Sequence, residues 1–251
     1  MFIFKASIGV WCRRIDCKGV TSSPSPRIRW FVVLLALVVP FLMSLIYFVL
    51  LPGTWLGNGL YVVMKIMLVV WPAVATLLIL RERLDLGLSN GWRLAIVGVG
   101  WGLGIVTLML GLMVTPLGDI IRAGADNIQT KVEGMGVLDH FVWFALFLSV
   151  IHSLIEEVYW RRFVAGNLLH LVSPWKAHLL AGIGFSAHHI VVVSQFFPLG
   201  MAFFLGSCVG IGGVLWSVLM VKQRSLLGAW MSHMVVDIGI MIIGARLMGL
   251  L

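Results

Sequence analysis

Long runs of apolar residues, separated by short polar connections, make up most of the chain from residue 30 onward. Each run approaches the 20 residues that an α-helix needs to cross the hydrocarbon core of a bilayer. Pro174 and Pro198 separate runs in the second half, because proline lacks an amide donor and ends helices. The runs fall at 30–51, 59–80, 94–114, 137–158, 176–193, 197–221 and 226–250. The pattern predicts an all-α, polytopic membrane helical bundle.

Two stretches outside these runs leave the number of transmembrane helices at seven or eight. Residues 158–173 are amphipathic, and they either extend the fourth helix or add a short eighth one. Residues 115–136 form a long connection that we expect on the membrane surface. Glycines four residues apart predict close helix packing at three places: Gly98 and Gly102, Gly100 and Gly104, and Gly206 and Gly210.

Composition supports a membrane protein and excludes several classes of function. Of the 251 residues, 61% are hydrophobic and only 11% are charged. Soluble domains carry about a quarter charged residues, so this chain has too little polar surface for a water-soluble globule. The net charge of +8 is scattered between apolar runs rather than gathered on one face. We therefore expect the lipid bilayer, and no nucleic acid, as a partner.

The distribution of Lys and Arg predicts the orientation in the membrane. If seven helices alternate, 14 of the 18 basic residues lie on one side of the bilayer. These are Lys5, Arg13, Arg14, Lys18, Arg27, Arg29, Arg81, Arg83, Arg93, Arg161, Arg162, Lys176, Lys222 and Arg224. Cytoplasmic loops carry such an excess, so we expect a multi-pass integral membrane protein with its N-terminus in the cytoplasm. The tail at 1–29 is then a basic cytosolic extension, and no cleavable signal peptide is expected in it.

Three carboxylates cannot be assigned to water-exposed segments. Seven of the ten acidic residues lie in the tail, in connections or at a helix end, but Glu156, Glu157 and Asp237 lie at or inside apolar runs. Ionisable groups within a bilayer are costly and usually functional. Histidines accompany them on the same late helices: His152, His188, His189 and His233. This grouping predicts a polar site inside the second half of the chain.

Helical spacing sorts these residues into pairs. Glu156 and Glu157 are successive, so their side chains point about 100° apart and have different partners. Glu157 lies one turn before Arg161, which is the favoured order for an ion pair. His233 and Asp237 are also one turn apart and face the same way.

Three ordered motifs in this region carry a family resemblance. Glu156-Glu157-Val-Tyr-Trp-Arg161, Phe185-Ser-Ala-His-His189 and His233-Met-Val-Val-Asp237 resemble the patterns EExxxR, FxxxH and HxxxN or HxxxD. These patterns belong to the CAAX-protease and bacteriocin-processing (CPBP) family of intramembrane proteases, which is related to the type II CAAX prenyl endopeptidase. The resemblance covers about residues 137–250. It divides the chain into the tail (1–29), N-terminal membrane helices (30–136) and CPBP-like catalytic membrane helices (137–251).

The resemblance implies an endopeptidase that cleaves a membrane-associated protein or peptide. It makes Glu156 the general base that activates water and His189 the residue that holds the same water. Glu157 and Arg161 would shape the site and balance its charge. The resemblance assigns the last pair, His233 and Asp237, to stabilising the oxyanion or orienting its partners.

Two departures from the family pattern and one cofactor question stay open. Many members have asparagine where this chain has Asp237, and an ionised carboxylate only accepts hydrogen bonds, so orienting His233 is its expected role. His188 adjoins His189, and a shift of one residue in helix phase would exchange them. Glu156, His189 and His233 would also form a ligand set for zinc, with water in the fourth position. The local HExxH signature of zinc peptidases is absent.

Other interpretations compete with a peptidase. Glu157 and Arg161 could form a surface ion pair, and Lys65 could extend to an interface or mark a functional position. The string Gly87-Leu-Ser89-Asn-Gly91 matches a serine-hydrolase pattern but lacks the strand–turn–helix context. A transporter or proton-coupled carrier could use the same buried carboxylates and histidines as a relay. A catalytically silent scaffold is the third interpretation.

Overall fold

The computed structural model describes residues 24–88 and 91–251, so residues 1–23 of the predicted tail and Ser89 lie outside the described residues. The last four residues of that tail, 26–29, already belong to the first helix. Over the described residues the chain is helical and forms no strand. Within the same residues, seven helices are long and apolar enough to cross a membrane. They are Pro26–Leu50, Trp55–Ile79, Trp92–Met113, Leu138–Leu168, Pro174–Val193, Leu199–Gln223 and Leu227–Leu247. The predicted all-α bundle of seven or eight spans is confirmed with seven among the described residues, and each boundary except the end of the fourth span lies within four residues of its predicted place.

Several spans are built from shorter helical elements. In chain order they are α2 (Pro26–Leu45), η1 (Ile46–Leu50), α3 (Trp55–Val74), η2 (Ala75–Ile79), α4 (Trp92–Met113), α5 (Pro116–Ala123), α6 (Ala125–Gly134), η3 (Leu138–His140), α7 (Phe141–Leu146), η4 (Phe147–His152), α8 (Ser153–Glu157), η5 (Val158–Ala165), α9 (Gly166–Leu168), α10 (Pro174–Val193), α11 (Leu199–Gln223) and α12 (Leu227–Leu247). The amphipathic stretch after residue 158 extends the fourth span to Leu168 and adds no eighth one. Pro174 is the first residue of α10, and Pro198 caps α11, as their missing amide donors predict. The long connection forms the short helices α5 and α6; their place on the membrane surface stays a prediction.

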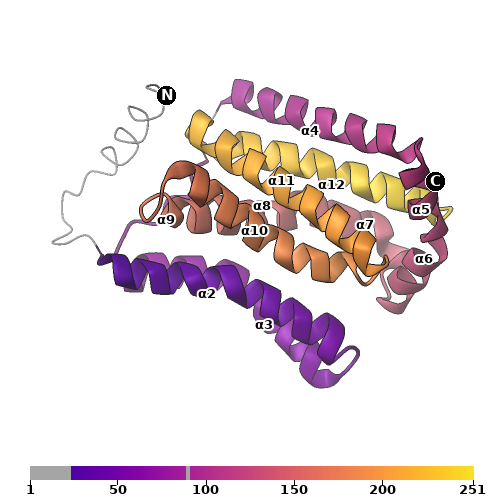
Figure 1. Ribbon diagram of the computed structural model, residues 1–251, viewed down its shortest axis with the longest axis horizontal. Helices are drawn as coiled ribbons and strands as arrows, with labels where there is room; N and C mark the ends of the chain where they lie inside the picture. The colour runs from indigo at the N-terminus through magenta and orange to yellow at the C-terminus, as the bar shows by residue number, and fades with distance from the viewer. Residues whose placement is uncertain (1–23, 89–90) are drawn as a thin grey trace.

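The second half of the chain forms the middle of the bundle. Helix α10 packs against α2 on one side and α11 on the other, and α12 packs against α11 and α4. Figure 1 shows α4 running along α12 at one margin of the bundle and α2 with α3 as a pair at the opposite margin. Helices from the first half therefore cover the helices that carry the candidate site. The division into membrane parts at residues 136 and 137, and the cytoplasmic N-terminus, stay predictions.

Glycines allow two of these helix contacts. A side chain at Gly98 would overlap the backbone of Gly228, so α4 approaches α12 this closely because Gly98 lacks one. Gly206 lies in the same way against Ile190 between α11 and α10. The prediction of close helix packing was wrong for Gly100 and Gly104, because no atom lies within 4 Å of a Cβ built at either glycine. That pair lies on the outer face of α4, since the helix can turn only one of its two glycine rows toward α12.

A proline inside α2 connects this helix to the candidate site. Pro40 has no N–H, so the carbonyl of Ala36, four residues earlier, loses its α-helical donor. The buried hydroxyl of Tyr159, on η5, donates a hydrogen bond of 2.8 Å to this carbonyl. A buried carbonyl without a donor is unfavourable, so this bond stabilises the packing of α2 against the fourth span.

Candidate active site

The fourth span widens on both sides of its glutamate pair. Glu156 and Glu157 end α8, a five-residue α-helical segment between the π-helical segments η4 and η5. Such wide turns are rare and often occur at functional sites. Glu156 is 5% exposed and Glu157 is fully buried, so both carboxylates lie inside the protein. As predicted from helical geometry, the two side chains have different surroundings.

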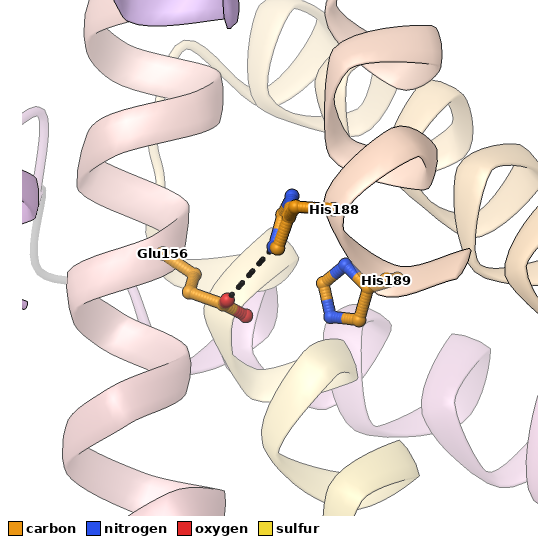
Figure 2. Close-up of side chains that lie close together, drawn as sticks. All are labelled: Glu156, His188 and His189. Atoms are coloured by element: carbon orange, nitrogen blue, oxygen red, sulfur yellow. Dashed lines mark ion pairs between the residues drawn. The ribbon is translucent and has the colours of Figure 1, made fainter. Parts of the chain in front are cut away.

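The Glu156 carboxylate faces imidazoles from three spans. Its Oε1 lies 3.4 Å from Nε2 of His152 and 3.6 Å from Nε2 of His188, and its Oε2 lies 3.8 Å from Nε2 of His233. His152 comes from the same span, His188 from α10 and His233 from α12. Figure 2 shows the Glu156 carboxylate pointing from its helix toward the histidines of α10. A carboxylate and several imidazoles converge here, and these are the groups that exchange protons with water near neutral pH.

The two successive histidines of α10 both lie beside Glu156. Ligand atoms of Glu156, His188 and His189 lie within 4.8 Å of one another, which also makes them a candidate metal-binding group. A carbonyl oxygen only accepts, so Nδ1 of His189 donates the 2.8 Å hydrogen bond to Phe185 and Nε2 is left free. The His188 ring stacks on Trp160 with an angle of 4° between the planes. The alternative between His188 and His189 therefore stays open, and Figure 2 shows both rings.

Glu157 forms a buried ionic contact with Arg161 and His233. Its Oε1 lies 3.2 Å from Nε of Arg161 and 2.9 Å from Nδ1 of His233. The Arg161 guanidinium also lies over the rings of Phe185 and Trp216, at 4.2 and 5.1 Å from their centroids. The surface ion pair considered for these residues is wrong, because the Glu157 and Arg161 side chains are 0% and 1% exposed. Arg161 also does not lie in a cytosolic connection, because the fourth span continues past it.

The His233 ring is held from both sides. Its Nδ1 contacts Glu157, and its Nε2 lies 3.6 Å from Oδ1 of Asp237. Trp216 stacks on the ring with a centroid distance of 4.2 Å, and the indole N–H donates to the Ser232 hydroxyl at 3.0 Å. The predicted contact between His233 and Asp237 forms, but Glu157 makes the shorter contact that orients the ring.

Sequence reasoning did not predict two of the contacts beside Glu156. It grouped His152 with the other histidines of the late helices but did not predict its contacts: its Nε2 lies within 3.4 Å of both the Glu156 carboxylate and Nζ of Lys65. Lys65 comes from α3, far from the motifs in the sequence. Its position inside an apolar run was the available signal. Trp216, which stacks on His233, was missed, and no feature of the sequence distinguished it from the other tryptophans.

The geometry of the site agrees with a comparison to known protein families. A family model described as type II CAAX prenyl endopeptidase Rce1-like matches residues 138–239. Residues 138–239 are an Rce1-like CAAX protease domain. This domain begins with the fourth span and ends in α12, so it contains Glu156, both α10 histidines and His233. Members of the family are CAAX protease peptide hydrolases. No curated protein and no solved structure matches the chain.

Proposed function

We propose that the Rce1-like domain is an intramembrane endopeptidase that cleaves a membrane-associated protein or peptide with a water activated by Glu156. The observation that carries this proposal is the approach of one buried carboxylate to within 4 Å of imidazoles from three spans. A general base must reach the proton that it removes, directly or through one water. Glu156 with its surrounding histidines is arranged for this task, and the spans around it supply a site of low water content.

The α10 histidines and His233 take complementary roles in this proposal. His188 or His189 holds the attacking water beside Glu156, and the free Nε2 of His189 suits this role. In its imidazolium form His233 donates from Nδ1 to Glu157 at 2.9 Å, whereas Nε2 lies 3.6 Å from Asp237, beyond hydrogen-bond distance. The Nε2–H of that form is a donor for the oxyanion that develops on the scissile carbonyl. Glu157 and Asp237 keep the ring oriented and its positive charge balanced.

A metal-dependent version of this function uses an overlapping set of residues. Glu156, His188 and His189 would hold a divalent ion such as zinc, whereas the sequence predicted Glu156, His189 and His233. When bound, zinc acts as a Lewis acid and lowers the pKa of its water. Loss of cleavage on chelation, with recovery on addition of zinc, would establish this version. Full activity after exhaustive chelation would establish the metal-free one.

The decisive experiment does not require a known substrate. Purified wild-type protein is reconstituted with membranes from cells of origin that lack it, and newly formed protein termini are quantified by mass spectrometry. Glu156→Gln is expected to lower their rate of formation at least about 100-fold, because general bases contribute about 10²- to 10⁴-fold. Glu133→Gln is the matched control, since this glutamate is exposed on α6 and, within the part of the chain that the structure describes, its carboxylate accepts one hydrogen bond, from Gln129.

The outcomes separate the peptidase from its rivals. A Glu156→Gln protein that folds normally and still cleaves at the wild-type rate would refute the role of Glu156. A wild-type protein that forms no new termini but takes up protons or solute in liposomes, with uptake abolished by Glu156→Gln, would identify a carrier instead. Neither activity in the wild type would identify a silent scaffold.

A further inference from the structure

Lys65 is a cation near the middle of a membrane span and has no ion pair among the described residues. It lies eleventh in the 25-residue span Trp55–Ile79. Its side chain is half-buried, and among the described residues no carboxylate oxygen lies within 4.0 Å of its ammonium group. Its neighbours are the Tyr61 ring, at 5.2 Å, and His152. A charge without an ion-pair partner at this depth is costly, so an anion that reaches Lys65 gains a charge-assisted hydrogen bond.

The ammonium group of Lys65 faces the candidate active site. Its Nζ lies 3.4 Å from Nε2 of His152, and the same nitrogen lies 3.4 Å from Oε1 of Glu156. Lys65 is therefore at most about 7 Å from the proposed general base. Nε2 of His152 cannot accept a hydrogen bond from Lys65 and donate one to Glu156 at the same time, so His152 does not satisfy both groups at once. An ammonium group has three donors, so His152 leaves at least two of them for a ligand.

We propose that Lys65 is a specificity-determining residue that binds a carboxylate of the substrate next to the scissile bond. The inference rests on the proposed peptidase function and assigns this site a substrate class. An extended residue spans about 3.3–3.6 Å, so 7 Å places the bound carboxylate within about two or three residues of the cleaved bond. Two groups of a peptide have this chemistry: the α-carboxylate of its C-terminus and the side chain of an aspartate or glutamate.

Lys65 lies outside the Rce1-like domain, so the proposed recognition of a substrate carboxylate depends on a helix that this domain does not include. Helix α3 lies outside residues 138–239, so the Rce1-like domain supplies the groups around Glu156 and the N-terminal helices supply the cation. A lysine that only extends its ammonium group toward an interface would not distinguish a charged substrate from a neutral one. Discrimination between a carboxylate and a carboxamide therefore separates the two roles.

The experiment uses the sequences that wild-type protein cleaves in reconstituted membranes. Each is synthesised as a peptide, and every carboxylate within three residues of the cleaved bond is replaced in turn by its carboxamide. At one of these positions, the carboxamide is expected to lower the kcat/KM of the wild-type protein about 10- to 100-fold, which corresponds to the loss of one charge-assisted hydrogen bond. Lys65→Met is expected to cleave the acid and the amide at rates within about twofold of each other, whereas Lys65→Arg keeps the preference. Lys176→Met, an exposed lysine at the start of α10, is the control and also keeps it.

A second measurement does not depend on the folding of a Lys65 variant. The Glu156→Gln protein is incubated with a peptide whose preferred carboxylate has been converted to an active ester. A lysine amine that lies beside this ester attacks it, an amide bond forms, and the ester alcohol leaves. Mass spectrometry is expected to find this modification on Lys65. Labelling elsewhere, equal wild-type rates for every acid and amide pair, or an unchanged preference in Lys65→Met would each overturn the proposal. A wild type that cleaves nothing refutes the peptidase itself, and this inference falls with it.

Discussion

Glu157→Gln tests whether the buried charge contact between α8, η5 and α12 stabilises the protein. The substitution keeps the size of the side chain and removes its charge. Arg161, which is 1% exposed, then has no carboxylate within 4.0 Å among the described residues, and His233 loses its closest charged acceptor. Among the described residues the guanidinium nitrogens of Arg161 have no hydrogen-bond partner either, so its charge is balanced by Glu157, by the more distant Glu156 and by two aromatic rings.

The distance between Arg161 and Glu157 sets the size of the expected effect. Opposite charges 3.2 Å apart attract by about 5 kcal/mol at an effective dielectric constant near 20. Removing one partner of a buried pair typically destabilises by about 3–5 kcal/mol, because the other charge stays buried. We therefore expect Glu157→Gln to lower the free energy of unfolding by about 3–5 kcal/mol. Adding Arg161→Met should recover most of this loss, because no uncompensated charge remains in the contact.

Equilibrium unfolding in mixed detergent micelles measures these differences. Asp119→Asn is the matched control, because it breaks the 2.5 Å pair with Arg122 on α5, where the side chains are 74% and 48% exposed. An exposed pair contributes less than about 1 kcal/mol. If Glu157→Gln destabilises no more than the control, or if Arg161→Met adds a further loss, the buried-charge reasoning is refuted. Cleavage is expected to stay impaired in the double variant, because His233 still lacks its acceptor.

Two predictions concern helix packing and are measured as unfolding free energies in the same micelles. Tyr159→Phe is expected to destabilise by about 1–3 kcal/mol, because it leaves the buried Ala36 carbonyl without a donor. The loss should shrink in a Pro40→Ala background, which restores the helical N–H, and equal losses in both backgrounds would contradict this account. Gly98→Ala is expected to destabilise by about 1–3 kcal/mol because it forces α4 away from α12, whereas Gly100→Ala should change stability by less than about 0.5 kcal/mol. Equal effects of the two alanines would refute the assigned packing face.

The membrane spans could be predicted because the bilayer imposes their length and polarity. Every backbone polar group in hydrocarbon must be satisfied within its own segment, so apolar runs of about 20 residues become helices whatever packs beside them. The sequence could not say which glycine row of α4 would face a neighbour, since two interleaved rows have the same spacing. The contact of Gly98 with Gly228 decides this, and it depends on where α12 lies.

The sequence by itself determined the helical bundle and the short set of ionisable residues that cannot reach water, because both follow from the cost of polar groups in a bilayer. Only the tertiary structure decided how these residues combine. Glu157 proved to be the buried partner of Arg161 and His233, and Lys65 with His152 proved to lie beside Glu156. Spacing along one helix predicts which side chains share its face. Contacts between spans depend on how whole helices rotate and tilt against one another, and no local pattern of residues specifies that.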